Sequence, residues 1–91
     1  MKYIVKPTSR FRRDYKLMEK RSLDMSLLDE LIVKLAEGIP LPASNRDHPL
    51  TGRWSGHREC HIEPDWLLIY RIEATTKRIV FYRSGSHSDL F

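Results

Sequence analysis

The run Trp66–Tyr70 constrains the fold more than any other part of the chain, because all five of its residues are apolar. A strand that is apolar on both faces is typical of the interior of a sheet, so Trp66–Glu73 is expected to be a central strand. Five residues are far fewer than the roughly 20 that cross a bilayer, so no membrane-spanning segment is expected. A chain of 91 residues has room for one domain, residues 1–91, with one core.

Two more strand candidates flank this segment. His57–Ile62 precedes it and Arg78–Arg83 follows it. The intervening segments, Glu63–Asp65 and Ala74–Lys77, are rich in turn-forming residues and are short enough to join neighbouring strands. The C-terminal half is therefore predicted to form an antiparallel three-stranded meander.

The N-terminal half is predicted to contain one short strand and two helices. Tyr3–Val5 favours a strand that ends at Pro7, and a helix capped by Thr8 or Ser9 follows. The apolar residues of that helix recur at helical spacing at Phe11, Tyr15 and Met18. A second helix, which Ser22, Asp24 or Ser26 can start and Gly38 ends, presents Leu27, Leu28, Leu31, Ile32 and Leu35 on one face.

The predicted order is β-α-α-β-β-β, an α+β fold in which a helical hairpin packs on one sheet face and leaves the other face open for binding. The connection from Ile39 to Gly56 contains three prolines and two glycines, which predicts a long irregular loop. Loops of this length inside small domains are often functional.

The expected compartment is the cytoplasm. Cys60 is the single cysteine and cannot form an intramolecular disulfide. No charged segment followed by an apolar run opens the sequence, so a secretory signal is not expected.

Positive charge gathers near the N-terminus. The net charge is +4, and residues 1–23 alone carry eight basic and two acidic side chains, a net +6. The basic stripe of the first predicted helix consists of Arg12, Arg13, Lys16 and Lys20. Such a stripe can be a solvated helix face, a contact for nucleic-acid phosphates, or a contact for an acidic protein.

The histidines of the C-terminal half could bind a metal ion or transfer protons. His57 and His61 lie on one strand face, but at about 3.3 Å per residue their Cα atoms would be roughly 13 Å apart. A shared zinc ion is therefore not expected, and no metal site is predicted.

Cleavage of RNA by its own 2′-hydroxyl needs a base, an acid and a cationic group on the phosphate. The residues that could supply these groups are His48, His61, Asp65, Arg83 and His87. Each also has a structural interpretation: a turn residue, a polar strand position or part of a fraying tail.

Three segments in order, Asp47–Arg58, Glu59–Tyr70 and Arg83–Phe91, resemble the YafQ family of bacterial toxins in the RelE/ParE superfamily. The N-terminal half resembles that family in layout only. The resemblance implies the toxin of a type II toxin–antitoxin module that cleaves translated mRNA on the ribosome. It further implies attack by the 2′-hydroxyl with no metal or cofactor, leaving a 2′,3′-cyclic phosphate and a 5′-hydroxyl.

By motif position, the resemblance assigns catalytic roles to His48, His61, Asp65, Arg83 and His87. It assigns contacts with the RNA substrate to Trp66 and Phe91, whose rings could stack an unpaired base; a core position for Trp66 is nearly as well supported. His57 has no counterpart.

The implied partners are the ribosome, mRNA and a cognate antitoxin, with operator DNA reached only through the antitoxin and no membrane. The basic stripe would dock on ribosomal RNA.

Two other functions stay open. ParE-like members share the layout but act by binding DNA gyrase, and they are not expected to carry this histidine set. A bare RNA-binding module would use the histidines only to contact phosphate.

Overall fold

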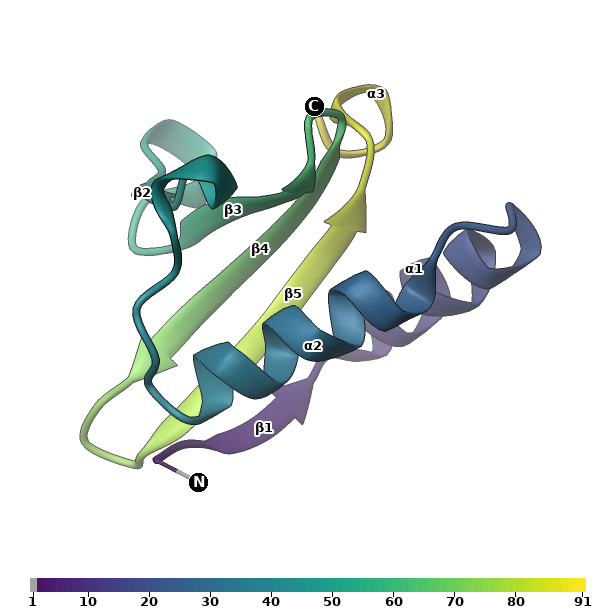
Figure 1. The fold of residues 1–91 in the computed structure, drawn as a ribbon. Coiled ribbons are helices and arrows are strands. Elements are labelled where there is room, and N and C mark those ends of the chain that lie inside the picture. Colours follow the sequence, from purple (N-terminus) through teal and green to yellow (C-terminus); the bar gives the residue numbers. More distant parts are fainter. Residues whose placement is uncertain (1) are drawn as a thin grey trace.

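The computed structural model describes residues 2–91, in which two helices lie side by side across one face of a single mixed sheet (Figure 1). The strands are β1 (Ile4–Pro7), β2 (His48–Pro49), β3 (Arg58–Glu63), β4 (Trp66–Glu73) and β5 (Arg78–Gly85). The helices are α1 (Ser9–Lys20), α2 (Met25–Ala36) and α3 (His87–Leu90), with short 3-10 helices η1 (Ala43–Asn45) and η2 (Gly52–Trp54).

The sheet has five strands in the order β1-β5-β4-β3-β2. The predicted α+β class and the antiparallel meander β3-β4-β5 are confirmed, with β4 in the middle. The meander is extended at both edges, because β1 pairs in parallel with β5 and β2 pairs with β3. Strand β3 begins and ends one residue later than predicted, and β5 continues two residues further, to Gly85.

Strand β2 corrects the prediction of an irregular loop around His48. His48 lies opposite Glu59 in the sheet, and Pro49 lies opposite Arg58. An edge strand tolerates proline because its outer N–H has no ladder to join. The carboxylate of Asp47 fixes this segment by accepting hydrogen bonds from Tyr70 Oη at 2.8 Å and Arg58 Nε at 3.2 Å.

The core lies between the helices and the sheet. The buried helix residues are Phe11, Met18, Leu28, Leu31, Leu35 and Ala36, and the buried sheet residues that they pack with are Cys60, Trp66, Leu68, Tyr70, Ile79 and Phe81. The Thr8 side chain caps α1 and the Asp24 side chain caps α2, as two of the predicted alternatives. Burial raises the pKa of the Cys60 thiol, so this cysteine is a core residue and not a reactive one.

The sheet face opposite the helices was predicted to be open, but it is covered at Leu67 and Ile69. Leu67 and Ile69 alternate with the core residues of β4, yet both are fully buried. A bulge on β5 lies beside them, because Ile69 pairs with Arg83 and Tyr70 pairs with Phe81, which leaves Tyr82 without a partner. Within residues 2–91 no helix combines the length and apolar character that crossing a membrane requires.

Candidate active site

Three imidazole rings from distant parts of the chain lie in a row. His48 comes from β2, His61 from β3 and His87 from the first position of α3. The ring centroids of His48 and His61 are 6.5 Å apart, and those of His61 and His87 are 5.8 Å apart. The pairing of β2 with β3 joins the first two, and α3 brings the third back to the turn between β3 and β4 (Figure 1).

Asp65 holds His87 in place from that turn. One oxygen, Oδ1, accepts hydrogen bonds from the backbone N–H of His87 at 2.9 Å and from His87 Nδ1 at 2.6 Å. These bonds, the backbone one first, lower the pKa of Asp65, so the carboxylate is ionised near neutral pH. An ionised carboxylate only accepts, so Nδ1 carries the proton and Nε2 is the nitrogen left for a substrate.

The other two histidines share one carboxylate that the sequence analysis did not single out. Glu59 Oε2 lies 2.9 Å from His48 Nε2 and 3.6 Å from His61 Nε2. Glu59 and His61 are both 6% exposed, whereas about half of the His48 side chain is exposed. The signal for Glu59 was present, because a residue two positions from His61 in a strand points to the same face.

His48, Glu59 and His61 could also hold a metal ion, since one ligand atom from each lies within 4.8 Å of the others. Two imidazoles and a carboxylate suit zinc or copper. The prediction of no metal site was based on the separation of His57 and His61, and this set was not predicted. His57 instead packs edge-on against Tyr82, with 4.5 Å between the ring centroids.

Arg83 is paired across the sheet edge with α1. Its Nε and Nη2 donate to the two oxygens of Asp14 at 2.8 and 3.2 Å, and the Ser84 backbone N–H donates to the same carboxylate at 3.1 Å. Arg83, which was predicted to be a catalytic residue, therefore has a structural ion pair with Asp14 as well. Its position opposite Ile69, which in turn lies opposite Glu59, places it in the same cross-strand row as the histidine network.

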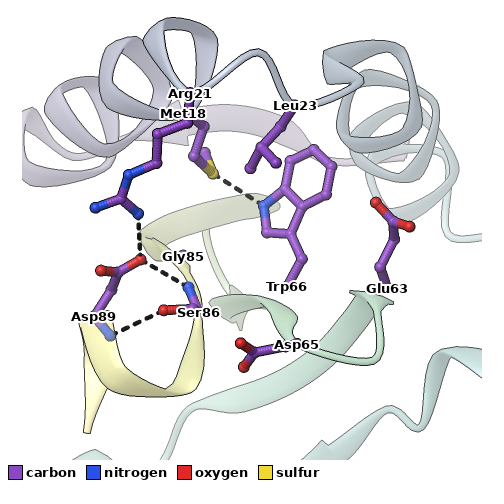
Figure 2. Close-up of a pocket in the computed structure, with 9 residues that line it drawn as sticks. All are labelled: Met18, Arg21, Leu23, Glu63, Asp65, Trp66, Gly85, Ser86 and Asp89. Atoms are coloured by element: carbon purple, nitrogen blue, oxygen red, sulfur yellow. Dashed lines mark hydrogen bonds and ion pairs between the residues drawn. The ribbon is translucent and has the colours of Figure 1, made fainter.

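The two predicted substrate-stacking residues differ in exposure. Phe91 is 63% exposed, as a stacking role requires. Trp66 is 4% exposed, and its indole N–H donates to Met18 Sδ at 2.9 Å (Figure 2). The same N–H also donates to Ser84 Oγ at 3.2 Å. Its faces cannot stack an RNA base, so the predicted substrate contact is corrected to a core role.

A capping box orders the C-terminal segment, for which a fraying tail was one of the alternatives left open by the sequence. The Ser86 side chain accepts a hydrogen bond from the Asp89 backbone, and the Asp89 side chain accepts one from the Ser86 backbone. Arg21, at the end of α1, donates to Asp89 at 2.8 Å and is the main reason that the pKa of Asp89 falls to about 2 (Figure 2). The pattern Ser-x-x-Asp was the sequence signal for this cap.

The basic stripe of α1 lies outside this cluster. Its four members, Arg12, Arg13, Lys16 and Lys20, are all exposed. Phe11 and Met18 on the same helix are buried, so the charged residues occupy the solvent side as the helical spacing predicted.

Known proteins match this chain over almost its whole length. The family model described as "Bacterial toxin of type II toxin-antitoxin system, YafQ" matches residues 3–91. The mRNA interferase toxin YafQ of Escherichia coli strain K12 is 45% identical over 85 residues, which cover 92% of this chain and 90% of that protein.

Two solved structures extend the comparison. The E. coli DinJ-YafQ complex matches with a TM-score of 0.89 and 41% identity over 98% of both chains. A metal-bound toxin from Helicobacter pylori matches with a TM-score of 0.91 and 37% identity over 98% of this chain and 99% of that one. The chain therefore belongs to the YafQ family of bacterial toxins from type II toxin–antitoxin systems.

Proposed function

We propose that this chain is an endoribonuclease that cleaves translated mRNA on the ribosome. The observation that carries this proposal is the side-by-side placement of two imidazole–carboxylate groups, with 5.8 Å between the rings of His61 and His87. A relative of high identity bears the name mRNA interferase toxin. Two proton-exchanging groups at this spacing suit the two oxygens that gain and lose protons when a phosphodiester is cleaved.

The proposed reaction takes its proton donors and acceptors from the RNA and these side chains. The ribose 2′-oxygen attacks the adjacent phosphorus, the bond from phosphorus to the 5′-oxygen breaks, and the electrons leave with that oxygen. One imidazole takes the 2′-hydroxyl proton and another protonates the departing 5′-oxygen. The products are a 2′,3′-cyclic phosphate and a 5′-hydroxyl, so atoms and charge balance.

His87 Nε2 serves one of these oxygens, and the His48–Glu59–His61 network serves the other. Asp65 cannot easily be the second proton carrier, because its Oδ1 already accepts both hydrogen bonds from His87. Asp65 is instead a positioning residue that fixes the His87 ring and tautomer.

Arg83 provides positive charge for the scissile phosphate, and Phe91 provides an exposed ring for a neighbouring base. The bonds to Asp14 use Nε and one N–H of Nη2, which leaves Nη1 for a phosphate oxygen. Asp14 already offsets part of the positive charge of Arg83. The imidazoles must therefore also stabilise the negative charge of the transition state.

The ribosome supplies the alignment that so small a site lacks. We expect it to bend the message until the 2′-oxygen lies in line with the phosphorus. The exposed basic stripe of α1 would then dock on ribosomal RNA phosphates. Charge reversal of Arg12, Arg13, Lys16 and Lys20 should weaken ribosome binding and flatten its salt dependence.

A cognate antitoxin is the second partner. A related YafQ is solved in a complex with DinJ. For this chain we propose an acidic, extended antitoxin segment that folds on binding and covers the basic stripe, and operator DNA would be reached only through it. Co-expression with the adjacent small open reading frame should yield a stable complex. Recovery of the toxin with no bound protein would count against this partner.

Substitution of His87 by Ala tests the proposal. Cleavage of a translated reporter should be lost while sedimentation with ribosomes is retained. A bare RNA-binding module or a ParE-like toxin would show no cleavage in the unsubstituted protein either. Cleavage at the original rate by His87→Ala would contradict the proposed chemistry.

A further inference from the structure

A groove that Arg83 helps to line includes none of the three histidines of the candidate active site. It has a volume of about 570 Å³, and its walls include Arg10, Arg53, Trp54, Tyr82, Arg83 and Phe91. Arg83 lines this groove and also shares a cross-strand row with Ile69 and Glu59. Phe91 follows α3, and its backbone N–H donates to the His87 carbonyl at 2.8 Å, so the two residues lie one helical turn apart.

Three rings build one wall of the groove before any ligand is present. The centroids of His57 and Tyr82 are 4.5 Å apart with the planes at 84°, and those of Trp54 and His57 are 5.3 Å apart at 86°. Trp54 and Tyr82 are themselves 6.5 Å apart. Edge-to-face packing of this kind is favourable and fixes the orientation of each ring.

The backbone holds these rings in place. His57 donates its backbone N–H to the Trp54 carbonyl at 3.0 Å, directly after a turn that contains Gly52 and Gly56, whose φ angles are +63° and +88°. Tyr82 is the bulged residue of β5, and a bulge redirects its side chain relative to its neighbours. The wall therefore needs little ordering when a ligand binds.

The charge of the groove is positive. Arg10 and Arg53 are exposed, and neither makes an ion pair within residues 2–91. The acidic residue in the wall, Asp89, is already engaged by Arg21. Aromatic rings beside unpaired guanidinium groups are the combination that binds single-stranded nucleic acid.

We propose that this groove binds the RNA nucleotide next to the scissile phosphate. The base lies against Tyr82, Trp54 and Phe91, and Arg10 and Arg53 contact its phosphate. This inference rests on the proposed function, because it extends the RNA path from His87 and Arg83 into the groove.

The test measures binding of a fluorescent, uniformly 2′-O-methylated hexanucleotide, which has no 2′-hydroxyl and cannot be cleaved. Tyr82→Ala should weaken binding about tenfold, because stacking of one base is lost. Tyr82→Phe keeps the ring and should bind like the original protein. Arg53→Ala should weaken binding and reduce the dependence of log K on log salt by about one.

Arg71→Ala is the matched control, because it removes the same charge from an exposed residue outside the groove. It should bind the hexanucleotide like the original protein, and thermal melting should show every variant folded. Equal binding by all variants, or equal losses in Arg71→Ala and Arg53→Ala, would overturn the proposed subsite. Tight binding of a polyglutamate probe that falls equally in Tyr82→Ala would also overturn it in favour of an acidic peptide.

Cleavage of a translated reporter, measured in parallel, separates this inference from the proposed function. If the original protein cleaves while the groove variants bind the probe normally, the subsite is wrong and the nuclease stands. If the original protein does not cleave, the proposed function fails whatever the binding result.

Discussion

Removal of the Asp14 carboxylate should destabilise the protein by about 3 kcal/mol. Asp14 accepts three hydrogen bonds, two from Arg83 and one from the Ser84 backbone. The Arg83 and Asp14 side chains are only 14% and 12% exposed, so the pair resembles a buried one. Breaking a buried pair costs about 3–5 kcal/mol, and an exposed pair at most about 1 kcal/mol.

Urea unfolding of Asp14→Ala, Arg83→Ala and the double variant measures this interaction as a double-mutant cycle. We expect a coupling free energy of about 2 kcal/mol. Asp29→Ala is a suitable control, because its carboxylate accepts one exposed hydrogen bond from Tyr15 and should cost less than about 1 kcal/mol.

The same variants separate the two roles of Arg83. If Arg83 also contacts the scissile phosphate, Arg83→Ala should lose far more cleavage than Asp14→Ala, although both lose the ion pair. A coupling free energy near zero would show that the Asp14–Arg83 pair does not behave as a buried ion pair. Cleavage losses that match in the two variants would refute the phosphate contact.

Three further predictions concern the cluster and its support. Asp65→Asn should lose most cleavage, with ribosome binding and thermal stability retained, because a neutral amide no longer fixes the Nδ1 proton of His87; unchanged single-turnover cleavage would contradict the positioning role. The pKa of Asp89 falls from 3.8 to about 2, so its bonds stabilise the fold above about pH 4 and this contribution disappears between pH 4 and 2. Asp89→Asn should therefore cost about 1 kcal/mol in urea unfolding at pH 7 and almost nothing at pH 2, whereas an equal cost at both values would count against it. A chelator should leave cleavage unchanged, whereas added Zn²⁺ should inhibit cleavage by occupying His48, Glu59 and His61. His48→Gln should weaken zinc binding to the protein, measured with a metal-binding probe.

The central strand and the buried face of α1 could be predicted from the spacing of apolar residues along the sequence. The apolar run of β4 and the helical spacing of Phe11 and Met18 placed the central strand and the buried face of α1 correctly. Strand β2 and helix α3 were missed because two paired residues and one helical turn have no periodicity. They form because Asp47, the Ser86–Asp89 cap and partners from other elements hold them.

The candidate site shows the same division. The histidines, Asp65 and Arg83 could be named from residue type and resemblance, but the pairing of Arg83 with Asp14 joins residues 69 positions apart. No local pattern contains that contact. An all-apolar strand also cannot reveal which face meets the helices, so the burial of Trp66 required the packed structure.

The most direct test of the central claim is the chemistry of the cut RNA ends on a reporter transcript, measured with and without translation. We expect cuts only in translated codons, with a 2′,3′-cyclic phosphate on one side and a 5′-hydroxyl on the other. Equal cutting of untranslated RNA, or ends bearing a 3′-hydroxyl and a 5′-phosphate, would contradict this expectation.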